Sequence, residues 1–378
     1  MARDRAATGT TARDAQDSRE RFYLASHYQL MWWRFKKHRL ALVGGVILLV
    51  MYLAAGFSGF IAPYDMEEIT DVLLAPPQRL RFVSDDGLHL RPFVYAYTSR
   101  VDDRTWRRIY TEERSQRYPL RLFVRGADYK LWGLFDSNLH LFGVEGGTAH
   151  LFGTDGLGRD MFSRMVFGAR VSLSIGLIGV VLSFVLGIGI GGASGYFGGA
   201  TDVVVQRLIE FIRSIPVLPL WMALAAALPV HWSAIRIYFG ITIIVSLIGW
   251  TDLARVVRGK LLSLREEDFV MAGRIAGTTD PAIITRHLIP SFLSYVIVAL
   301  TLSVPSMILA ETSLSFLGLG LRPPVVSWGV LLSEAQNIHT LGLAPWLLIP
   351  GLFIIVTVLA FNFVGDGLRD AADPYASH

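Results

Sequence analysis

Side chains with the potential for catalysis or metal binding are sparse in this 378-residue sequence. The densest group of carboxylates and glycines is the run GTDGLGRD at residues 153–160. It lacks the alternating ligands and the terminal glutamate of a calcium-binding loop, so we interpret it as a turn. The turn leads into an amphipathic segment that is expected to place Met161 on its apolar face and Arg159 and Arg164 on the opposite face. Because the sequence has no Cys, no phosphate-binding loop and no zinc or nucleophile motif, we predict no catalytic residue, no metal site and no cofactor.

A second group of polar residues lies inside otherwise apolar stretches. Its members are Asp252, Arg255, Ser303, Ser306 and Glu311. A charge at the centre of a membrane helix costs about 2.5–3.5 kcal/mol on insertion scales, so such residues normally face the protein interior or a polar route. We predict that Asp252 and Arg255 pair one turn apart, and we hypothesise that Glu311 or Ser306 lines a polar route between the helices. The alternative is that these groups only hold helices together.

A third group consists of helix-capping and helix-breaking residues within residues 261–290, a loop between two apolar stretches. Apolar and small residues recur at helical spacing in its first half, which predicts a short helix. Gly277 is expected to end that helix as a C-cap, and Asp280 to cap a second short helix with Pro281 in its first position. Pro290 is expected to break the second helix. The spacing alone leaves open whether this helix–turn–helix is an interfacial elbow or a docking knob for a soluble partner.

The composition indicates the class of protein to which these groups belong. Hydrophobic residues make up 52% of the chain and charged residues 17%, against roughly 45–50% and about 25% in a soluble domain. The mean hydropathy is +0.45. These values exclude a disordered chain and a coiled coil, and they favour an integral membrane protein. The net charge of +4 requires no nucleic acid, since excess Lys and Arg in membrane proteins gathers on cytoplasmic flanks.

Long apolar stretches predict an all-α, polytopic membrane protein with six transmembrane helices. The first, at residues 39–62, follows a basic run at residues 34–39 and is expected to act as a signal anchor with its N-terminus inside the cell. The others are expected at residues 171–196, 211–230, 237–253, 292–317 and 345–364. Six spans place both termini in the cytoplasm. The second span carries Gly187, Gly191 and Gly195, which we interpret as small residues that let membrane helices approach closely rather than as a nucleotide-binding loop.

Residues 63–168 differ in character, with abundant Arg, Asp, Glu and aromatic residues and frequent turn residues. Irregular backbone of this length cannot lie in lipid, where its polar groups would have no partners. Runs at residues 91–98 and 120–124 predict strands. We therefore expect a β-rich extracytoplasmic insertion between the first and second spans, ending in an amphipathic lead-in to the second.

The loop at residues 261–290 resembles the signature loop of bacterial ABC-importer permeases, which reads Glu-Ala-Ala, three residues, Gly, nine residues and Ile-x-Leu-Pro. The positions in register with that signature are Ala272, Gly277 and Pro290. The positions that depart from it are Met271, Gly273, His287 and Ile289. Because the spacing is intact, the loss of the glutamate at Met271 is not expected to abolish docking.

Three other stretches resemble the C-type permease subunit of the dipeptide, oligopeptide and nickel importer family. They are residues 33–40, residues 153–173 and residues 311–329. The resemblance implies the type I ABC importer permease fold and a multi-pass protein of the cell inner (cytoplasmic) membrane. It also implies a heteromeric importer with a second permease subunit, two cytoplasmic ATP-binding subunits and an extracytoplasmic substrate-binding protein.

The same resemblance implies that this chain hydrolyses nothing and that separate ATPases drive alternating access to move di- or oligopeptides. The loop would seat in a groove of an ATPase subunit, and closure of the ATPases on ATP would rock the helix bundle. The implied coupling residues are Met271, Ala272, Gly273, Gly277, Asp280, Pro281, His287 and Pro290. A self-sufficient secondary transporter is the alternative, for which neither internal symmetry nor mid-span ion-coupling carboxylates are clear. A membrane-bound enzyme would need clustered His or acid pairs.

The predicted organisation has five parts. They are a cytoplasmic tail at residues 1–38, a first transmembrane helix at 39–62, the extracytoplasmic insertion and lead-in at 63–168, a five-helix core at 169–366 and a cytoplasmic tail at 367–378. The insertion is expected to receive the binding protein or to rest on the partner permease. The sequence leaves the cargo open among peptides, nickel chelates and microcin-like compounds.

Overall fold

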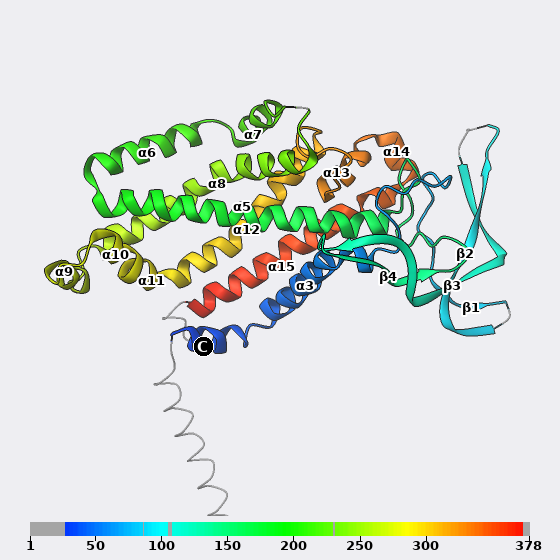
Figure 1. The fold of residues 1–378 in the computed structure, drawn as a ribbon, viewed down its shortest axis with the longest axis horizontal. Helices are drawn as coiled ribbons and strands as arrows, with labels where there is room; N and C mark the ends of the chain where they lie inside the picture. Colours follow the sequence, from blue (N-terminus) through cyan, green and yellow to red (C-terminus); the bar gives the residue numbers. More distant parts are fainter. Residues whose placement is uncertain (1–26, 86, 105–107, 230, 373–378) are drawn as a thin grey trace, which may run out of the picture.

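The computed structural model describes residues 27–372, apart from residue 86, residues 105–107 and residue 230. Long helices lie side by side in an elongated bundle, and a β-sheet lies beyond one end of it (Figure 1). Most of the predicted N-terminal tail, and residues 373–378 of the predicted C-terminal tail, lie outside the described residues.

Five helical segments of the described residues are long and apolar enough to cross a membrane. They are α3 (Arg39–Gly56), α5 (Met161–Phe197), α8 (Ala234–Leu264), α12 (Leu293–Phe316) and the segment Pro345–Ala372, which contains η3 (Pro345–Leu348) and α15 (Ile349–Ala372). These segments agree with five of the six predicted spans. The last helix continues to Ala372 and so extends into the predicted C-terminal tail.

The remaining predicted span, at residues 211–230, is not one continuous helix. The chain forms α6 (Gly199–Ser214) and α7 (Val217–Ala226), which are bent by 86° at the break between them and together are apolar enough to count as a sixth span. Pro216 explains the break, because proline lacks a backbone N–H and disfavours helical conformation in the residue before it. That residue, Ile215, is extended, with φ −90° and ψ 131°.

The central contact of the bundle joins α5 to α8 through small residues. A Cβ atom added at Gly191 would lie 2.5 Å from the carbonyl oxygen of Ala254, and one added at Gly195 would lie 2.7 Å from that of Arg258. A Cβ atom added at Gly187, one turn earlier, would lie 2.9 Å from the side chain of Leu253 in α8. The prediction that these glycines permit close helix approach is confirmed.

The described part of the insertion holds an antiparallel sheet of four strands in the order β1-β2-β3-β4. The strands are β1 (Arg81–Ser84), β2 (Gly87–Val101), β3 (Arg108–Leu131) and β4 (Phe135–Val144). The long strand β3 pairs with β2 along its first half and with β4 along its second, and the β3–β4 part reaches back to the helix bundle (Figure 1). The strands predicted at residues 91–98 and 120–124 lie within β2 and β3, which confirms a β-rich insertion.

Short helices complete the described chain. They are α2 (His27–Phe35), α4 (Ser58–Ile61), α13 (Trp328–Ser333), η2 (Glu334–Gln336) and α14 (Ile338–Leu343), together with the elements between α8 and α12 that are described below. The helices α13 and α14 lie at the end of the bundle that faces the sheet (Figure 1). We call this the sheet end.

Candidate functional site

The loop expected to contact an ATPase lies at the end of the bundle farthest from the sheet (Figure 1). It forms short helices joined by a π-helical turn. They are α9 (Asp268–Ile275), α10 (Asp280–Ile283), η1 (Ile284–Leu288) and α11 (Ile289–Ser291). We call residues 268–291 the knob. It connects the end of α8 to the start of α12, so two long helices of the bundle carry it.

Gly277 ends the first helix of the knob, as predicted. Its φ of +77° is a left-handed conformation that glycine adopts without strain. The N–H of Gly277 donates to the carbonyl of Arg274, and the N–H of Thr278 donates to the carbonyl of Gly273, both at 3.0 Å. These two hydrogen bonds form a Schellman motif, which satisfies the last carbonyls of α9 and turns the chain into α10.

The predicted cap of the second helix is wrong by one residue. Thr279, and not Asp280, occupies the N-cap position of α10, while Pro281 lies in the first turn. The carboxylate of Asp280 instead accepts a hydrogen bond from the hydroxyl of Tyr196 at 2.5 Å. Spacing within the loop could not reveal this use, because the partner precedes Asp280 by 84 positions.

Pro290 does not break the second helix, contrary to the prediction. The chain passes from α10 through η1 into α11, which contains Pro290, and leaves helical conformation only at Phe292 (φ −121°, ψ 15°). In an α-helix the proline ring crowds the carbonyl four residues earlier. The wider π-helical turn directly before Pro290 relieves that crowding, so the chain turns into α12 two residues later than expected.

Buried apolar contacts and one tyrosine fix the knob to the bundle. Val270 is 1% exposed and Ile283 is fully buried, and both pack with residues of α8 and α12. Tyr196, at the end of α5, contacts both halves of the knob: its hydroxyl binds Asp280, and its ring centroid lies 5.2 Å from the guanidinium of Arg274. The short helices are therefore a stiff extension of the bundle. Sequence analysis missed Tyr196, since nothing near it in the chain signals these contacts.

The outer face of the knob exposes apolar side chains. Phe269 is 43% exposed, Met271 is 47% exposed and Ile275 is 87% exposed, and Ala272 lies on the surface among them. Of the other implied coupling residues, those exposed are Gly277, Asp280, Pro281, His287 and Pro290. A group of large exposed apolar side chains is typical of an interaction surface.

The predicted pair of Asp252 and Arg255 does not form. Asp252 instead forms an ion pair with Arg213, in the last turn of α6, while Arg255 is exposed. The reason is the break at Pro216, which ends α6 next to this part of α8. A contact between two helices therefore replaces the contact expected within one.

Glu311 is fully buried and accepts several hydrogen bonds. The hydroxyls of Ser315 and Ser327 donate to its carboxylate at 2.7 Å each, and that of Ser172 donates at 3.4 Å. Ser327 is also the N-cap of α13, where its side chain accepts from the N–H of Val330. Glu311 thus joins α12 to α5 and α13, and its carboxylate does not reach the surface of the subunit.

The two serines next to Pro305 differ in their surroundings. The hydroxyl of Ser303 donates to the carbonyl of Ala299 in the same helix at 2.7 Å. Ser306 is exposed on α12. Of the route candidates in α12, Ser306 is the one whose side chain lies on an exposed face.

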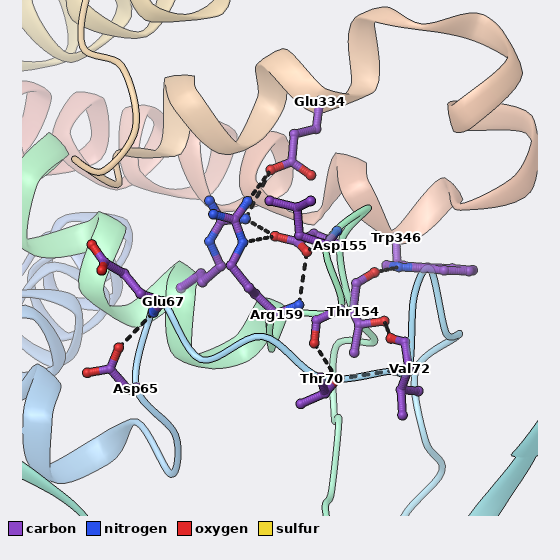
Figure 2. Close-up of polar contacts among 12 residues, drawn as sticks. Asp65, Glu67, Thr70, Val72, Thr154, Asp155, Arg159, Glu334 and Trp346 are labelled. Atoms are coloured by element: carbon purple, nitrogen blue, oxygen red, sulfur yellow. Dashed lines mark hydrogen bonds and ion pairs between the residues drawn. The ribbon is translucent and has the colours of Figure 1, made fainter.

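The run GTDGLGRD at residues 153–160 belongs to a buried polar junction at the sheet end (Figure 2). Asp155 is fully buried and forms ion pairs with Arg159 at 2.7 Å and with Arg164. Both arginines also contact Glu334 of η2, at 3.3 Å and 3.0 Å. Arg164 is 1% exposed, so its predicted place on a polar outer face is wrong. The carboxylates of Asp155 and Glu334 make its burial possible, since a buried charge needs such partners.

Thr154 connects this junction to two other parts of the chain. Its hydroxyl donates to the carbonyl of Val72 at 2.5 Å and accepts from the N–H of Ala75 at 2.8 Å. Its carbonyl accepts from the indole N–H of Trp346 in η3 at 2.9 Å (Figure 2). The start of the insertion, the lead-in to α5 and the start of the last span therefore meet here. Within the described residues, no group of three or more His, Asp or Glu side chains is placed to hold a metal ion.

Two family profiles match the sequence. The profile described as binding-protein-dependent transport system inner membrane component matches residues 179–378, which include the knob. The profile of the N-terminal TM domain of oligopeptide transport permease C matches residues 26–77. The first match alone covers more than half of the chain.

Individual relatives agree with these profiles. The dipeptide transport system permease protein DppC of Bacillus subtilis is 39% identical over 353 residues, which are 92% of this chain and 86% of that protein. The oligopeptide transport system permease protein OppC of Haemophilus influenzae is 42% identical over 218 residues, 57% of this chain and 68% of that protein. Among solved structures, an inward-facing MetNI methionine ABC transporter is similar with 17% identity and a TM-score of 0.44, over 56% of this chain and 97% of that chain.

Proposed function

This chain belongs to the family of binding-protein-dependent transport system inner membrane components, and on that premise we propose that its cargo is a di- or oligopeptide. It is a permease subunit of an ABC importer, and ATP hydrolysis resides in separate subunits. The observation that carries the peptide assignment is the alignment with the dipeptide permease DppC. That alignment covers 92% of this chain, a share that cannot be reached without the insertion.

The knob is the part that we assign to the ATPase contact. Its exposed apolar face, at Phe269, Met271 and Ile275, offers a surface for a soluble partner. Its buried side, at Val270 and Ile283, is packed into the bundle. A projection of this kind transmits the closure of an ATPase pair as a rigid-body motion of the helices. The intact spacing of the implied coupling residues supports the same assignment.

We assign the two ends of the bundle to opposite sides of the membrane. The basic run at residues 34–39 precedes α3, and the segment from α8 into the knob is rich in arginine. Short cytoplasmic segments carry such an excess of positive charge, so the knob and both termini belong in the cytoplasm. The insertion at residues 63–168 then faces outward, where it can meet the substrate-binding protein.

We infer that this subunit forms only one part of the transport pathway. A second, non-identical permease subunit completes it, and each permease subunit contacts one of two ATP-binding subunits. Ser306 is exposed on α12 and is our candidate for the route. Glu311 is buried among serine hydroxyls, so we assign it to the support of α12 rather than to direct contact with cargo.

Transport by the assembled complex in proteoliposomes tests this function. With ATP and the binding protein present, a labelled dipeptide is expected to accumulate against its gradient, and unlabelled peptides are expected to compete. Competition by a nickel chelate, with none by peptides, would overturn the peptide assignment. Uphill uptake by this chain alone, in an ion gradient without ATPase subunits, would favour a self-sufficient secondary transporter instead.

A further inference from the structure

The tip of the β3–β4 hairpin carries large apolar side chains that the chain itself leaves uncovered. Trp132 is 53% exposed, Leu134 is 77% exposed and Phe135 is 61% exposed. Phe123, farther along β3, is 61% exposed. Single exposed apolar residues are ordinary, but a contiguous group at a hairpin tip indicates a contact surface.

The position of this tip is fixed relative to the first membrane-spanning helix. The indole N–H of Trp132 donates to the carbonyl of Gly56, the last residue of α3, at 2.9 Å. Its ring lies 5.4 Å from that of Phe57, and the ring of Phe123 lies 6.3 Å from that of Phe60. The tip therefore lies at the level where a membrane span ends, which is the boundary between hydrocarbon and lipid headgroups.

The backbone at the tip holds a tryptophan where a smaller residue would fit more easily. Trp132 has a φ of +53° and Gly133 a φ of +73°, so both central residues of the turn have positive φ, as in a type I′ turn. Asn or Gly normally occupies the first of these positions, and a bulky residue there is a strained exception. Such strain persists where the surroundings hold it in place, and it is commonly associated with function.

The chemistry of the tip fits a lipid interface. Tryptophan is enriched at the headgroup level of membranes, because its ring is apolar and its N–H is polar. Leu134 and Phe135 supply apolar surface beyond it, and the charges of Lys130 and Asp136 lie behind the tip, with their side chains 70% and 82% exposed. Leu53, one turn before Gly56 on α3, is 50% exposed, so apolar surface continues from the span toward the hairpin.

We propose that the tip of the β3–β4 hairpin, residues 132–135, inserts into the lipid leaflet at the sheet end of α3 and anchors the insertion to the membrane surface. The contact fixes the height and tilt of the sheet above the bilayer. It is independent of the cargo and of the ATPase contact, because it involves neither the knob nor α12.

The absence of Cys from the sequence allows a direct test with single labelled positions. The variant L134C places a polarity-sensitive fluorophore at the tip. The matched control L90C places it on an equally apolar leucine of β2 that is 98% exposed. Strand β2 lies in the part of the sheet away from α3 (Figure 1). Both variants are assembled with their partner subunits in lipid nanodiscs, and quenching is measured with a nitroxide on the lipid acyl chain and with iodide in the water.

The label at Leu134 is expected to emit at shorter wavelength than the label at Leu90, to lose most of its emission to the lipid nitroxide and to resist iodide. The label at Leu90 is expected to show the opposite quenching pattern. If iodide quenches both labels equally, the tip lies in water and the proposal is wrong. If the Leu134 label resists both quenchers, the tip contacts another protein subunit, and the lipid assignment is equally overturned.

Discussion

The hydroxyl of Tyr196 donates to the carboxylate of Asp280 at 2.5 Å and joins the end of α5 to the second half of the knob. The ring of Tyr196 also lies against Arg274 of α9. This one side chain therefore holds α9 and α10 in a fixed orientation relative to α5. On the proposed ATPase contact, we expect this side chain to affect how far a motion of the knob is transmitted to the bundle, rather than whether the ATPase binds.

The variant Tyr196→Phe removes the hydroxyl and keeps the ring. A hydrogen bond to a charged group contributes about 1.5–3 kcal/mol, so the knob is expected to loosen and peptide uptake per ATP hydrolysed to fall several-fold. Uptake and ATPase rates in proteoliposomes measure this ratio. Tyr295→Phe, at a 47% exposed tyrosine of α12, serves as the control. An unchanged ratio in Tyr196→Phe at equal complex abundance would remove the hydrogen bond from the coupling mechanism.

We expect substitution by alanine at two glycines of the knob to change the thermal stability in opposite directions. Gly277→Ala forces a Cβ into a left-handed conformation (φ +77°), which costs about 1–2 kcal/mol. Gly273→Ala adds a Cβ that would lie 3.9 Å from Ile283, inside a helix where alanine is better than glycine by about 1 kcal/mol. Thermal unfolding of the purified complexes is expected to show a lower Tm for Gly277→Ala and an equal or higher Tm for Gly273→Ala. The reverse order would contradict the role of Gly277 as a C-cap.

The exposed face of the knob is expected to be sensitive to charge. Ile275→Arg places a cation on the proposed ATPase surface, so copurification of the ATP-binding subunits is expected to be lost. Ile338→Arg is the matched control, because Ile338 is 85% exposed against 87% for Ile275 and lies on α14 at the opposite end of the bundle. Met271→Glu restores the family residue and is expected to retain copurification. Full retention in Ile275→Arg would place the ATPase contact elsewhere.

The buried polar junction formed by Asp155, Arg159, Arg164 and Glu334 is expected to contribute strongly to the stability of the fold at the sheet end. Asp155→Asn leaves the buried guanidinium of Arg164 short of one carboxylate, and breaking a buried ion pair costs about 3–5 kcal/mol. Glu210→Gln breaks an exposed pair with Arg207, which is worth about 0–1 kcal/mol. A fall in Tm or in membrane abundance is expected for Asp155→Asn alone. Equal stability of the two variants would show that Glu334 compensates fully.

We expect substitutions at Ser306 and at Glu311, both in α12, to impair different properties of the complex. Ser306→Trp adds bulk to an exposed position and is expected to reduce peptide uptake while the complex stays assembled. Glu311→Gln places an amide among serine donors, so its effect is expected in thermal stability, at about 1–3 kcal/mol for an unsatisfied buried group. Normal uptake by Ser306→Trp would remove this face of α12 from the route.

Local features of the chain could be predicted from the sequence because their causes are local. Five of the six apolar stretches form one long helix each, because their length and composition alone determine it, and the glycines of α5 at spacings of four must share one face. The positive φ at Gly277 likewise follows from its place after a short helix. These predictions need no knowledge of distant partners.

Contacts between distant segments could not be predicted in this way. Arg164 looked like a surface residue because Glu334, which helps to neutralise it, follows 170 positions later. The partner of Asp252 depended on the direction of α6, which the break at Pro216 sets. The binding of Asp280 by Tyr196 and the pinning of Trp132 to Gly56 are of the same kind, since each joins residues more than 70 positions apart.

Helix α5 begins next to Arg164 and the polar junction and ends at Tyr196 and the knob, with no break along its 37 residues. At 1.5 Å per residue it measures about 55 Å, so it acts as a lever arm through the whole thickness of the membrane. A swing of a few degrees imposed at one end displaces the other by several ångströms, and no joint along the shaft absorbs it. We therefore expect a displacement of the knob to move the sheet end of the bundle as well, because one unbroken helix joins the two.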